Sequence, residues 1–528
     1  MSVLDAVVFD LYGTLLHITR KRVAREIPRH LGARPATWME LLRGELLVRP
    51  FADDAALVHF VAETLAPERA PGAEAAAVAC MDDELASVVP APGVLSLLSF
   101  LKRRGLKLGA LSNLASPYKA ALSSAGIDVL LDAAGFSCDE GITKPDPEIY
   151  RRLLRRLEVE PERTLFVGDS KGNDVETPAA LGLLTAGIGV SGGDVTLGAA
   201  ADLGLLDLSA RPFEPLLAPG RRVRVGDLSV EVKSFLPVDD DEQGRYNLVY
   251  AVDSVDLAGV PWRLFVKRFL LPETAYVEEF AYRLQAETGL GACEVSVLEG
   301  PEPLLLMTEA PGRKLNLAVV SEAAPGGAAE IASAKSPATR SEVLRSPATR
   351  MNSALAFEVG RHFGFGFLFS NADLRPRNSF LLLTAQGPRL TVVDMEHCLF
   401  NLAIETEGLA RPERPETFDE LPQPELLARV KRRVLTRKTS PRAKRTFLTD
   451  AARGSEIGQA FDAGFLDFYR RQQRRAGELC ALISARVHAE PPLVIGTHAY
   501  RRAMAEADVE DIRQRLAMSA EDALEWMW

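Results

Sequence analysis

Three short apolar runs in the first third of the chain each lead directly into polar side chains, and this repeated pattern constrains the fold most. Val7-Val8-Phe9 precedes Asp10, Leu108–Leu111 precedes Ser112-Asn113, and Leu165-Phe166-Val167 precedes Gly168-Asp169. Short apolar runs of this kind predict buried strands. Open α/β sheets place their functional groups at the carboxyl ends of such strands. The sequence therefore predicts an α/β domain with Asp10 at the end of its first strand.

A fourth motif, Lys144-Pro145-Asp146-Pro147, precedes a predicted helix, and Asp174 follows Asp169 by five residues. In this order the motifs resemble those of the haloacid dehalogenase-like hydrolase superfamily. The resemblance implies a Rossmann-like sheet with Asp10 as nucleophile. It also implies that Ser112 binds the transferring phosphoryl group, that Lys144 neutralises its charge, and that Asp169 and Asp174 hold Mg²⁺ together with Asp10. A carboxylate can form the aspartyl intermediate that such chemistry needs, and a cation and a metal ion can stabilise the transferring group.

Residues 17–92 lie between the first two motifs and are mostly helical in pattern, as at 55–65 and 73–85. The resemblance implies that this segment is a helical cap that sets substrate choice. We expect the hydrolase domain to span 1–212. A linker is predicted at 213–221, where closely spaced Pro and Gly residues are typical of loops.

Position 12 departs from the phosphatase pattern. Phosphatases of this superfamily carry a second Asp there as general acid, whereas this chain has Tyr12, as the dehalogenases do. Asp169 and Asp174 nevertheless match the metal-binding pattern of the phosphatases. We expect a Mg²⁺-dependent phosphohydrolase that is weak on poor leaving groups, because the roughly 10²–10⁴-fold contribution of proton transfer is missing. A 2-haloacid dehalogenase-like hydrolase and a lost activity are the alternatives.

Beyond the linker the pattern changes, and residues 222–528 are expected to form a second, α+β bilobal domain. The predicted strands are 228–235, 247–252 and 264–267, and the helix that follows is 276–286. This order resembles the N-terminal lobe of protein-kinase-like enzymes. The resemblance implies that Lys267 contacts the α- and β-phosphates of ATP and pairs with Glu278, with Glu279 as the alternative. It also implies a hinge at 304–309 that holds adenine.

Residues 363–397 contain three further side chains with oxygens that suit Mg²⁺ or an attacking hydroxyl. Asp373 and Asn378 are five residues apart on an apparent loop, and Asp394 closes an apolar strand. The order resembles the catalytic loop and metal-binding Asp of protein-kinase-like enzymes, most closely the phosphoinositide and Hip-type kinases, with aminoglycoside-phosphotransferase-like kinases as the near alternative. The resemblance implies that Asp373 orients the acceptor hydroxyl and that Asn378 and Asp394 bind Mg²⁺.

Three features depart from the kinase pattern. No G-x-G-x-x-G loop is present, Asn371 stands where the catalytic-loop His is usual, and Asp394-Met395-Glu396 replaces D-F-G. A catalytically silent kinase-like module is therefore the alternative for this domain. Residues 324–350 repeat Ser-Pro-Ala-Thr-Arg and are predicted to be a disordered insertion.

The composition excludes several functional classes. The net charge of -10 argues against a general nucleic-acid binder. The five cysteines have no paired spacing, which fits a reducing cytoplasm rather than a disulfide framework. No apolar run reaches the roughly 20 residues that span a bilayer. We expect a cytoplasmic fusion of a hydrolase and an ATP-dependent phosphotransferase with a small phosphorylated substrate, or else a hydrolase gated by a silent kinase fold that senses nucleotide.

Overall fold

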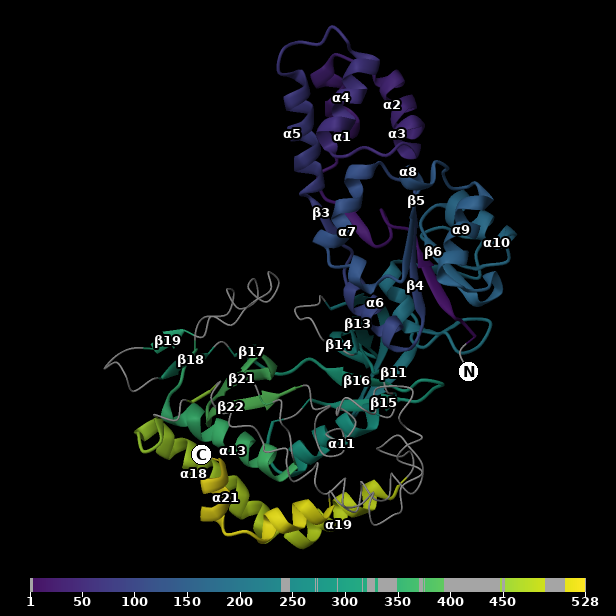
Figure 1. Cartoon of the computed structure of the whole chain (residues 1–528). Coiled ribbons are helices and arrows are strands. Elements are labelled where there is room, and N and C mark those ends of the chain that lie inside the picture. The colour runs from purple at the N-terminus through teal and green to yellow at the C-terminus, as the bar shows by residue number, and fades with distance from the viewer. Residues whose placement is uncertain are drawn as a thin grey trace. The chain divides into compact units, whose positions relative to one another are not determined.

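The chain forms two compact units, Met1–Leu217 with Pro237–Leu248 and Ala218–Leu236 with Val249–Trp528 (Figure 1). The computed structural model describes residues 3–238, 247–270, 272, 274–291, 293–315, 317–320, 328–330, 349–369, 374, 376–393, 447–448, 452–489 and 509–527. The functional domains expected at 1–212 and 222–528 stay a prediction. Among the described residues no helix is long and apolar enough to cross a membrane.

A six-stranded parallel sheet forms the centre of the first unit, in the order β5-β4-β1-β6-β7-β8. The strands are β1 (Ala6–Phe9), β4 (Lys107–Ser112), β5 (Ala133–Phe136), β6 (Thr164–Gly168), β7 (Leu184–Ile188) and β8 (Val195–Leu197). All four residues of β1 are buried, as expected for a central parallel strand covered on both faces. The Rossmann-like α/β fold predicted for the N-terminal region is confirmed.

Helices cover this sheet and complete its core. They include α6 (Val94–Arg103), α9 (Pro147–Leu157) and α10 (Thr177–Ala180). Ile149 and Leu153 of α9 pack in one cluster with Val8 of β1 and Phe166 of β6. Asp146 caps α9 by accepting a hydrogen bond from the Glu148 amide, and Pro147 occupies the first helical position. These two residues explain why the helix begins at Pro147, three residues after Lys144.

An insertion of five helices interrupts the first unit between β2 (Leu16–Ile18) and β3 (Val88–Pro90), which pair with each other. Its helices are α1 (Val23–Leu31), α2 (Pro35–Arg43), α3 (Glu45–Val48), α4 (Asp54–Leu65) and α5 (Ala73–Leu85), and they have their own apolar core around Trp38. The bundle lies beyond one end of the parallel sheet (Figure 1). The helices predicted at 55–65 and 73–85 are confirmed as α4 and α5.

The second unit begins with a six-stranded sheet in the order β11-β12-β13-β14-β16-β15. The strands are β11 (Arg222–Val225), β12 (Leu228–Pro237), β13 (Leu248–Asp256), β14 (Pro261–Arg268), β15 (Val295–Leu298) and β16 (Leu304–Thr308). Helix α11 (Thr274–Glu287) follows β14 and packs against β15 and β16. The strand and helix positions predicted from the sequence are therefore confirmed in this part of the chain.

Helices make up much of the rest of the second unit. Helix α13 (Ser353–Phe369) packs along α18 (Glu456–Arg474), and a Cβ at Gly360 would lie 2.1 Å from the Phe461 carbonyl oxygen, so only glycine permits this approach. The other elements are β17 (Arg313–Lys314), the β21 (Ser379–Thr384) and β22 (Gly387–Val392) hairpin, α19 (Ala476–Val487) and α21 (Ala520–Met527).

A small sheet of β18 (Leu317–Val320), β19 (Ala328–Glu330) and β20 (Thr349–Arg350) includes two stretches of the insertion that the sequence predicts to be disordered. Residues 328–330 pair with β18 in the antiparallel sense and residues 349–350 pair with it in the parallel sense, and the disordered insertion expected over 324–350 stays a prediction. Residues 331–348 lie outside the described residues.

Candidate functional site

The register of the parallel sheet brings three of the predicted motifs to one edge. Phe9 of β1 pairs with Ala110 of β4 on one side and with Val167 of β6 on the other. The Asp10 amide then donates to the Val167 carbonyl, 2.8 Å away, so Asp10 continues the line of β1. Ser112 and Gly168 close the two neighbouring strands. Because parallel strands end at the same edge, the motifs of three separate segments meet there.

Lys144 joins this group through two buried ion pairs. Its ammonium lies 2.7 Å from Asp10 Oδ1 and 2.7 Å from Asp174 Oδ1, and its side chain is 2% exposed. Ser112 Oγ donates to the same Asp10 oxygen at 3.3 Å. Burial lowers the pKa of Lys144, but the carboxylates of Asp10 and Asp174 outweigh it, so the pKa is raised and the ammonium stays charged. The structure thus brings Asp10, Ser112, Lys144 and Asp174 together, and the roles expected of them stay predictions.

Asp169 completes a set of three carboxylates at this edge. One oxygen each from Asp10, Asp169 and Asp174 can be chosen so that all lie within 4.8 Å of one another. Burial, and then the charge of Asp10, raise the pKa of Asp169. Hard divalent cations prefer carboxylate oxygens. The donor set therefore fits Mg²⁺.

Gly13 makes room for this arrangement. Its φ is +98°, and a Cβ at this position would lie 2.2 Å from Asp169 Oδ2. A larger residue would have to displace the Asp169 carboxylate or abandon the turn. The glycine after Tyr12 is thus required by the position of an acid more than 150 residues later in the chain.

Two residues that sequence reasoning did not assign hold Lys144 and the Asp174 turn. Asn113 and Lys144 exchange two hydrogen bonds: Asn113 Nδ2 donates to the Lys144 carbonyl at 2.8 Å, and the Lys144 amide donates to Asn113 Oδ1 at 2.7 Å. Tyr150 donates its hydroxyl to the Asn173 carbonyl, next to Asp174. The place of Asn113 directly after Ser112 could have indicated its role. No pattern in the sequence around Tyr150 indicates its role.

Tyr12 is turned to a different partner. Its hydroxyl donates to the Tyr118 carbonyl at 2.8 Å, and the two rings meet edge to face with centroids 5.6 Å apart. Tyr118 in turn donates its hydroxyl to Glu84 at 2.7 Å. Tyr12 stands where phosphatases of the resembled superfamily carry a general acid, but its hydroxyl is already hydrogen-bonded to the Tyr118 carbonyl.

In the second unit the structure pairs Lys267 of β14 with Glu278 of α11. Lys267 Nζ lies 2.8 and 3.1 Å from the two Glu278 carboxylate oxygens, and the Glu278 side chain is fully buried. The alternative partner, Glu279, instead pairs with Arg283 at 2.6 Å. Buried charges of this kind are paired because an unpaired one is costly.

The remaining predicted residues of this unit are only partly described. Asn378 is buried, and its carbonyl accepts a 2.8 Å hydrogen bond from the amide of Val393, the residue before Asp394. Asp373 and Asp394 themselves lie outside the described residues. The magnesium site expected from Asn378 and Asp394 therefore stays a prediction.

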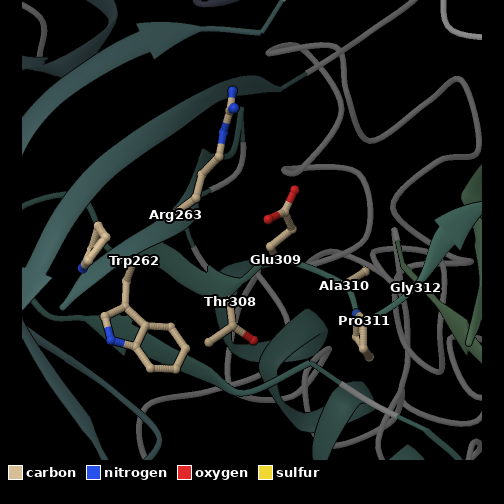
Figure 2. Close-up of a pocket in the computed structure, with 8 residues that line it drawn as sticks. Trp262, Arg263, Thr308, Glu309, Ala310, Pro311 and Gly312 are labelled. Carbon is tan, nitrogen blue, oxygen red and sulfur yellow. The ribbon is translucent and has the colours of Figure 1, made fainter. Parts of the chain in front are cut away.

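A pocket of about 490 Å³ adjoins the segment predicted to be the hinge. It is lined by residues 261–263 at the start of β14 and 308–312 at and beyond the end of β16. Figure 2 shows Arg263 and Glu309 on one side of the two strands and Trp262 and Thr308 on the other. The lining thus includes a positive side chain, a negative side chain and an aromatic ring.

Comparison with known proteins matches residues 4–182 to the family model "haloacid dehalogenase-like hydrolase". Phosphoglycolate phosphatase of Rhodospirillum rubrum is 34% identical over 205 residues, which cover 34% of this chain and 76% of that protein. Glyceraldehyde 3-phosphate phosphatase of Methanopyrus kandleri is 36% identical over 115 residues, covering 22% of this chain and 49% of the relative, so the match spans about half of its length. A solved HAD phosphatase from Thermococcus onnurineus is 22% identical with a TM-score of 0.29, covering 38% and 96% of the two chains.

Proposed function

The chain belongs, through residues 4–182, to the haloacid dehalogenase-like hydrolases, and on this basis we propose that its first unit is a Mg²⁺-dependent phosphohydrolase of a small phosphorylated metabolite. The observation that carries the proposal is the set of Asp10, Asp169 and Asp174, with oxygens within 4.8 Å of one another beside the buried Lys144. The phosphatase activities named for two relatives support it.

In the proposed reaction, a carboxylate oxygen of Asp10 attacks the phosphorus atom. The bond to the leaving-group oxygen breaks, the leaving group takes the electron pair, and an aspartyl phosphate remains. Water then attacks phosphorus, releasing inorganic phosphate and restoring the carboxylate. Lys144 and Ser112 stabilise charge on the phosphoryl oxygens throughout. Mg²⁺ bound by Asp10, Asp169 and Asp174 would neutralise negative charge on the transferring group.

The carboxylate set also bears on the dehalogenase alternative. Displacement of halide from carbon by Asp10 leaves no highly charged phosphoryl group to neutralise. Asp169 and Asp174 beside Asp10 would then add only repulsion at the nucleophile, since one ammonium faces three carboxylates. This excess of negative charge favours the phosphohydrolase.

Removal of divalent cations tests the proposal. Purified chain treated with EDTA is expected to lose hydrolysis of p-nitrophenyl phosphate, and added Mg²⁺ is expected to restore it, because the three carboxylates otherwise repel the anionic substrate. Release of p-nitrophenol measures both arms. Equal hydrolysis with and without EDTA would contradict the assignment of Asp169 and Asp174 as metal ligands.

The leaving group is expected to control the rate. Because the Tyr12 hydroxyl is donated to the Tyr118 carbonyl, the position that supplies a proton in related phosphatases does not do so here. We expect kcat for p-nitrophenyl phosphate, whose leaving group departs as a stable anion, to exceed kcat for glycerol phosphate by roughly 10²-fold or more. Initial rates of phosphate release measure this. Equal kcat values would mean that another group donates the proton.

A second candidate function concerns the second unit, for which we propose nucleoside-triphosphate-dependent phosphotransfer, with ATP as the expected donor. The buried Lys267–Glu278 ion pair supports it, since a strand lysine held by a helix glutamate is a recurring part of kinase-like sites. In this proposal Lys267 contacts the phosphates, Asp373 orients the acceptor hydroxyl, and Asn378 and Asp394 hold Mg²⁺. The alternative is a silent kinase fold that senses nucleotide and gates the hydrolase.

The C-terminal end of α11 is held in a way that would keep Glu278 in place. The carbonyl of Glu287, the last residue of the helix, accepts a hydrogen bond from Arg475 at 3.0 Å. The carbonyls of the next two residues, Thr288 and Gly289, accept from Gln472 of α18 at 3.4 Å and from Arg361 of α13 at 2.9 Å. Cationic side chains are also favourable at this negative end of the helix dipole. This clamp supports a fixed Lys267–Glu278 pair.

A further inference from the structure

Glu84 is a buried carboxylate near the end of α5 that is satisfied by neutral donors. It is 5% exposed, and it accepts hydrogen bonds from the amides of Arg22 and Val23, at 2.5 and 2.6 Å, and from the Tyr118 hydroxyl at 2.7 Å. In the described part of the chain no cationic side chain pairs with it; the Arg22 guanidinium binds Glu26 and Asp83 instead. Burying a carboxylate costs free energy, so these three hydrogen bonds are needed to stabilise Glu84.

The partners of Glu84 explain why it lies there. Arg22 is the N-cap residue of α1 and Val23 is its first residue, and the Arg22 side chain makes no capping hydrogen bond. The carboxylate supplies the missing acceptor for two of the unpaired amides and a negative charge for the positive end of the helix dipole. Glu84 therefore holds the start of the first cap helix against the end of the last one.

The two chain segments that enter and leave the insertion are joined nearby. The Thr19 amide donates to the Ser87 carbonyl at 3.2 Å, and the Arg20 amide donates to Ser87 Oγ at 3.1 Å. Asp83 also accepts from the Arg20 and Arg22 guanidinium groups. These contacts hold the segment that enters the cap against the segment that leaves it.

Tyr118 links these two segments to the edge of the sheet that carries Asp10. It lies in a short 3₁₀ turn, Ser116–Lys119, a few residues after Ser112. Its hydroxyl binds Glu84, while its carbonyl and ring contact Tyr12, two residues after Asp10. We call Tyr12, Tyr118 and Glu84 the cap-positioning network.

We propose that Tyr118 and Glu84 are positioning residues that fix the angle of the cap relative to Asp10, and that Tyr12 serves this network instead of transferring a proton. The inference rests on the proposed phosphohydrolase. In this proposal the cap forms part of the surface that binds the substrate, so a change in its angle removes contacts that the substrate and the transition state share. Loss of such uniform binding raises KM and leaves kcat nearly constant. The network acts on substrate binding through geometry and touches neither phosphorus nor metal.

The test compares Tyr118→Phe, Glu84→Gln and the double variant in the full chain with p-nitrophenyl phosphate as probe. Tyr118→Phe deletes one hydroxyl and keeps the ring packing. We expect KM to rise at least fivefold in each single variant, with kcat changed less than threefold. The double variant should be no worse than the poorer single variant, because both break one network. Glu74→Gln, in the first turn of the same helix, is the matched control and should keep wild-type KM.

Hydrogen exchange supplies a readout that does not depend on activity. In Glu84→Gln the amides of Arg22 and Val23 should exchange at least tenfold faster, whereas those of α4 should be unchanged. Unchanged KM and exchange, or a fall in kcat at constant KM, would overturn the inference. If Glu84→Gln does not fold, Tyr118→Phe decides it by the same criteria. If the wild type hydrolyses no phosphate ester, the proposed function fails, and exchange at Arg22 and Val23 alone decides whether the network holds the cap.

Discussion

Replacing Asp10 by Asn is expected to reduce hydrolysis of p-nitrophenyl phosphate by roughly 10³-fold or more. The amide has nearly the shape of the carboxylate but neither its charge nor its nucleophilicity, so no aspartyl phosphate can form. It also removes one of the two carboxylates that lie 2.7 Å from Lys144. Turnover with saturating Mg²⁺ measures the loss, and trapping of a phosphorylated chain should succeed with the wild type alone.

The matched control is Asp5→Asn. Asp5 directly precedes β1, but its carboxylate pairs with Arg163 at the surface, where both side chains are 45% exposed. Exposed pairs of this kind contribute little to stability, so activity should stay at the wild-type level. Thermal unfolding of both variants separates a catalytic loss from a folding defect. Unchanged turnover in folded Asp10→Asn would remove the nucleophile assignment.

Replacing Asp373 by Ala is expected to abolish nucleotide-dependent phosphotransfer while hydrolysis by the first unit continues. The acceptor hydroxyl would lose the carboxylate that orients it, which in kinase-like enzymes removes most of the rate. Consumption of ATP by the wild type, measured with and without candidate acceptors, comes first because it distinguishes a phosphotransferase from a silent nucleotide sensor. The variant then locates the activity.

Arg283→Ala is a suitable control for this second experiment. Arg283 lies on α11 but pairs with Glu279 rather than with Glu278, and its side chain is 66% exposed. Its loss should leave phosphotransfer unchanged. Phosphotransfer that persists in Asp373→Ala would refute the kinase interpretation, and ATP binding without consumption in the wild type would favour the sensor.

The meeting of the candidate site residues of the first unit at one edge of the sheet could be predicted because the signals for it are local. Asp10, Ser112 and Asp169 each follow an apolar run, and a parallel sheet places the ends of such runs together whatever the intervening chain does. Lys144 has a weaker local signal, because only the prolines that follow it set it apart in the sequence. The role expected for it came from the resemblance. Its position between Asp10 and Asp174 depends on tertiary packing.

The cap-positioning network could not be predicted, because it too depends on tertiary packing. Glu84 and Tyr118 are 34 residues apart, in a helix end and a 3₁₀ turn, and neither position carries a periodic or motif signal. The departure at Tyr12 was visible, but the partner of its hydroxyl was not. In the second unit, Glu278 and Glu279 differ by one helical position, and the fold alone turns the first toward Lys267 and the second toward Arg283.

The pairing of β2 with β3 has a consequence for how such a protein can diversify. Because the two strands run side by side, the chain leaves the sheet domain and returns to it through neighbouring residues, such as Ile18 and Val88. Everything between these points can lengthen, shrink or be exchanged without altering the path of the strands that bear the chemistry. The insertion and the carboxyl edge of the sheet can therefore accumulate substitutions separately, because only two neighbouring points of the chain join them.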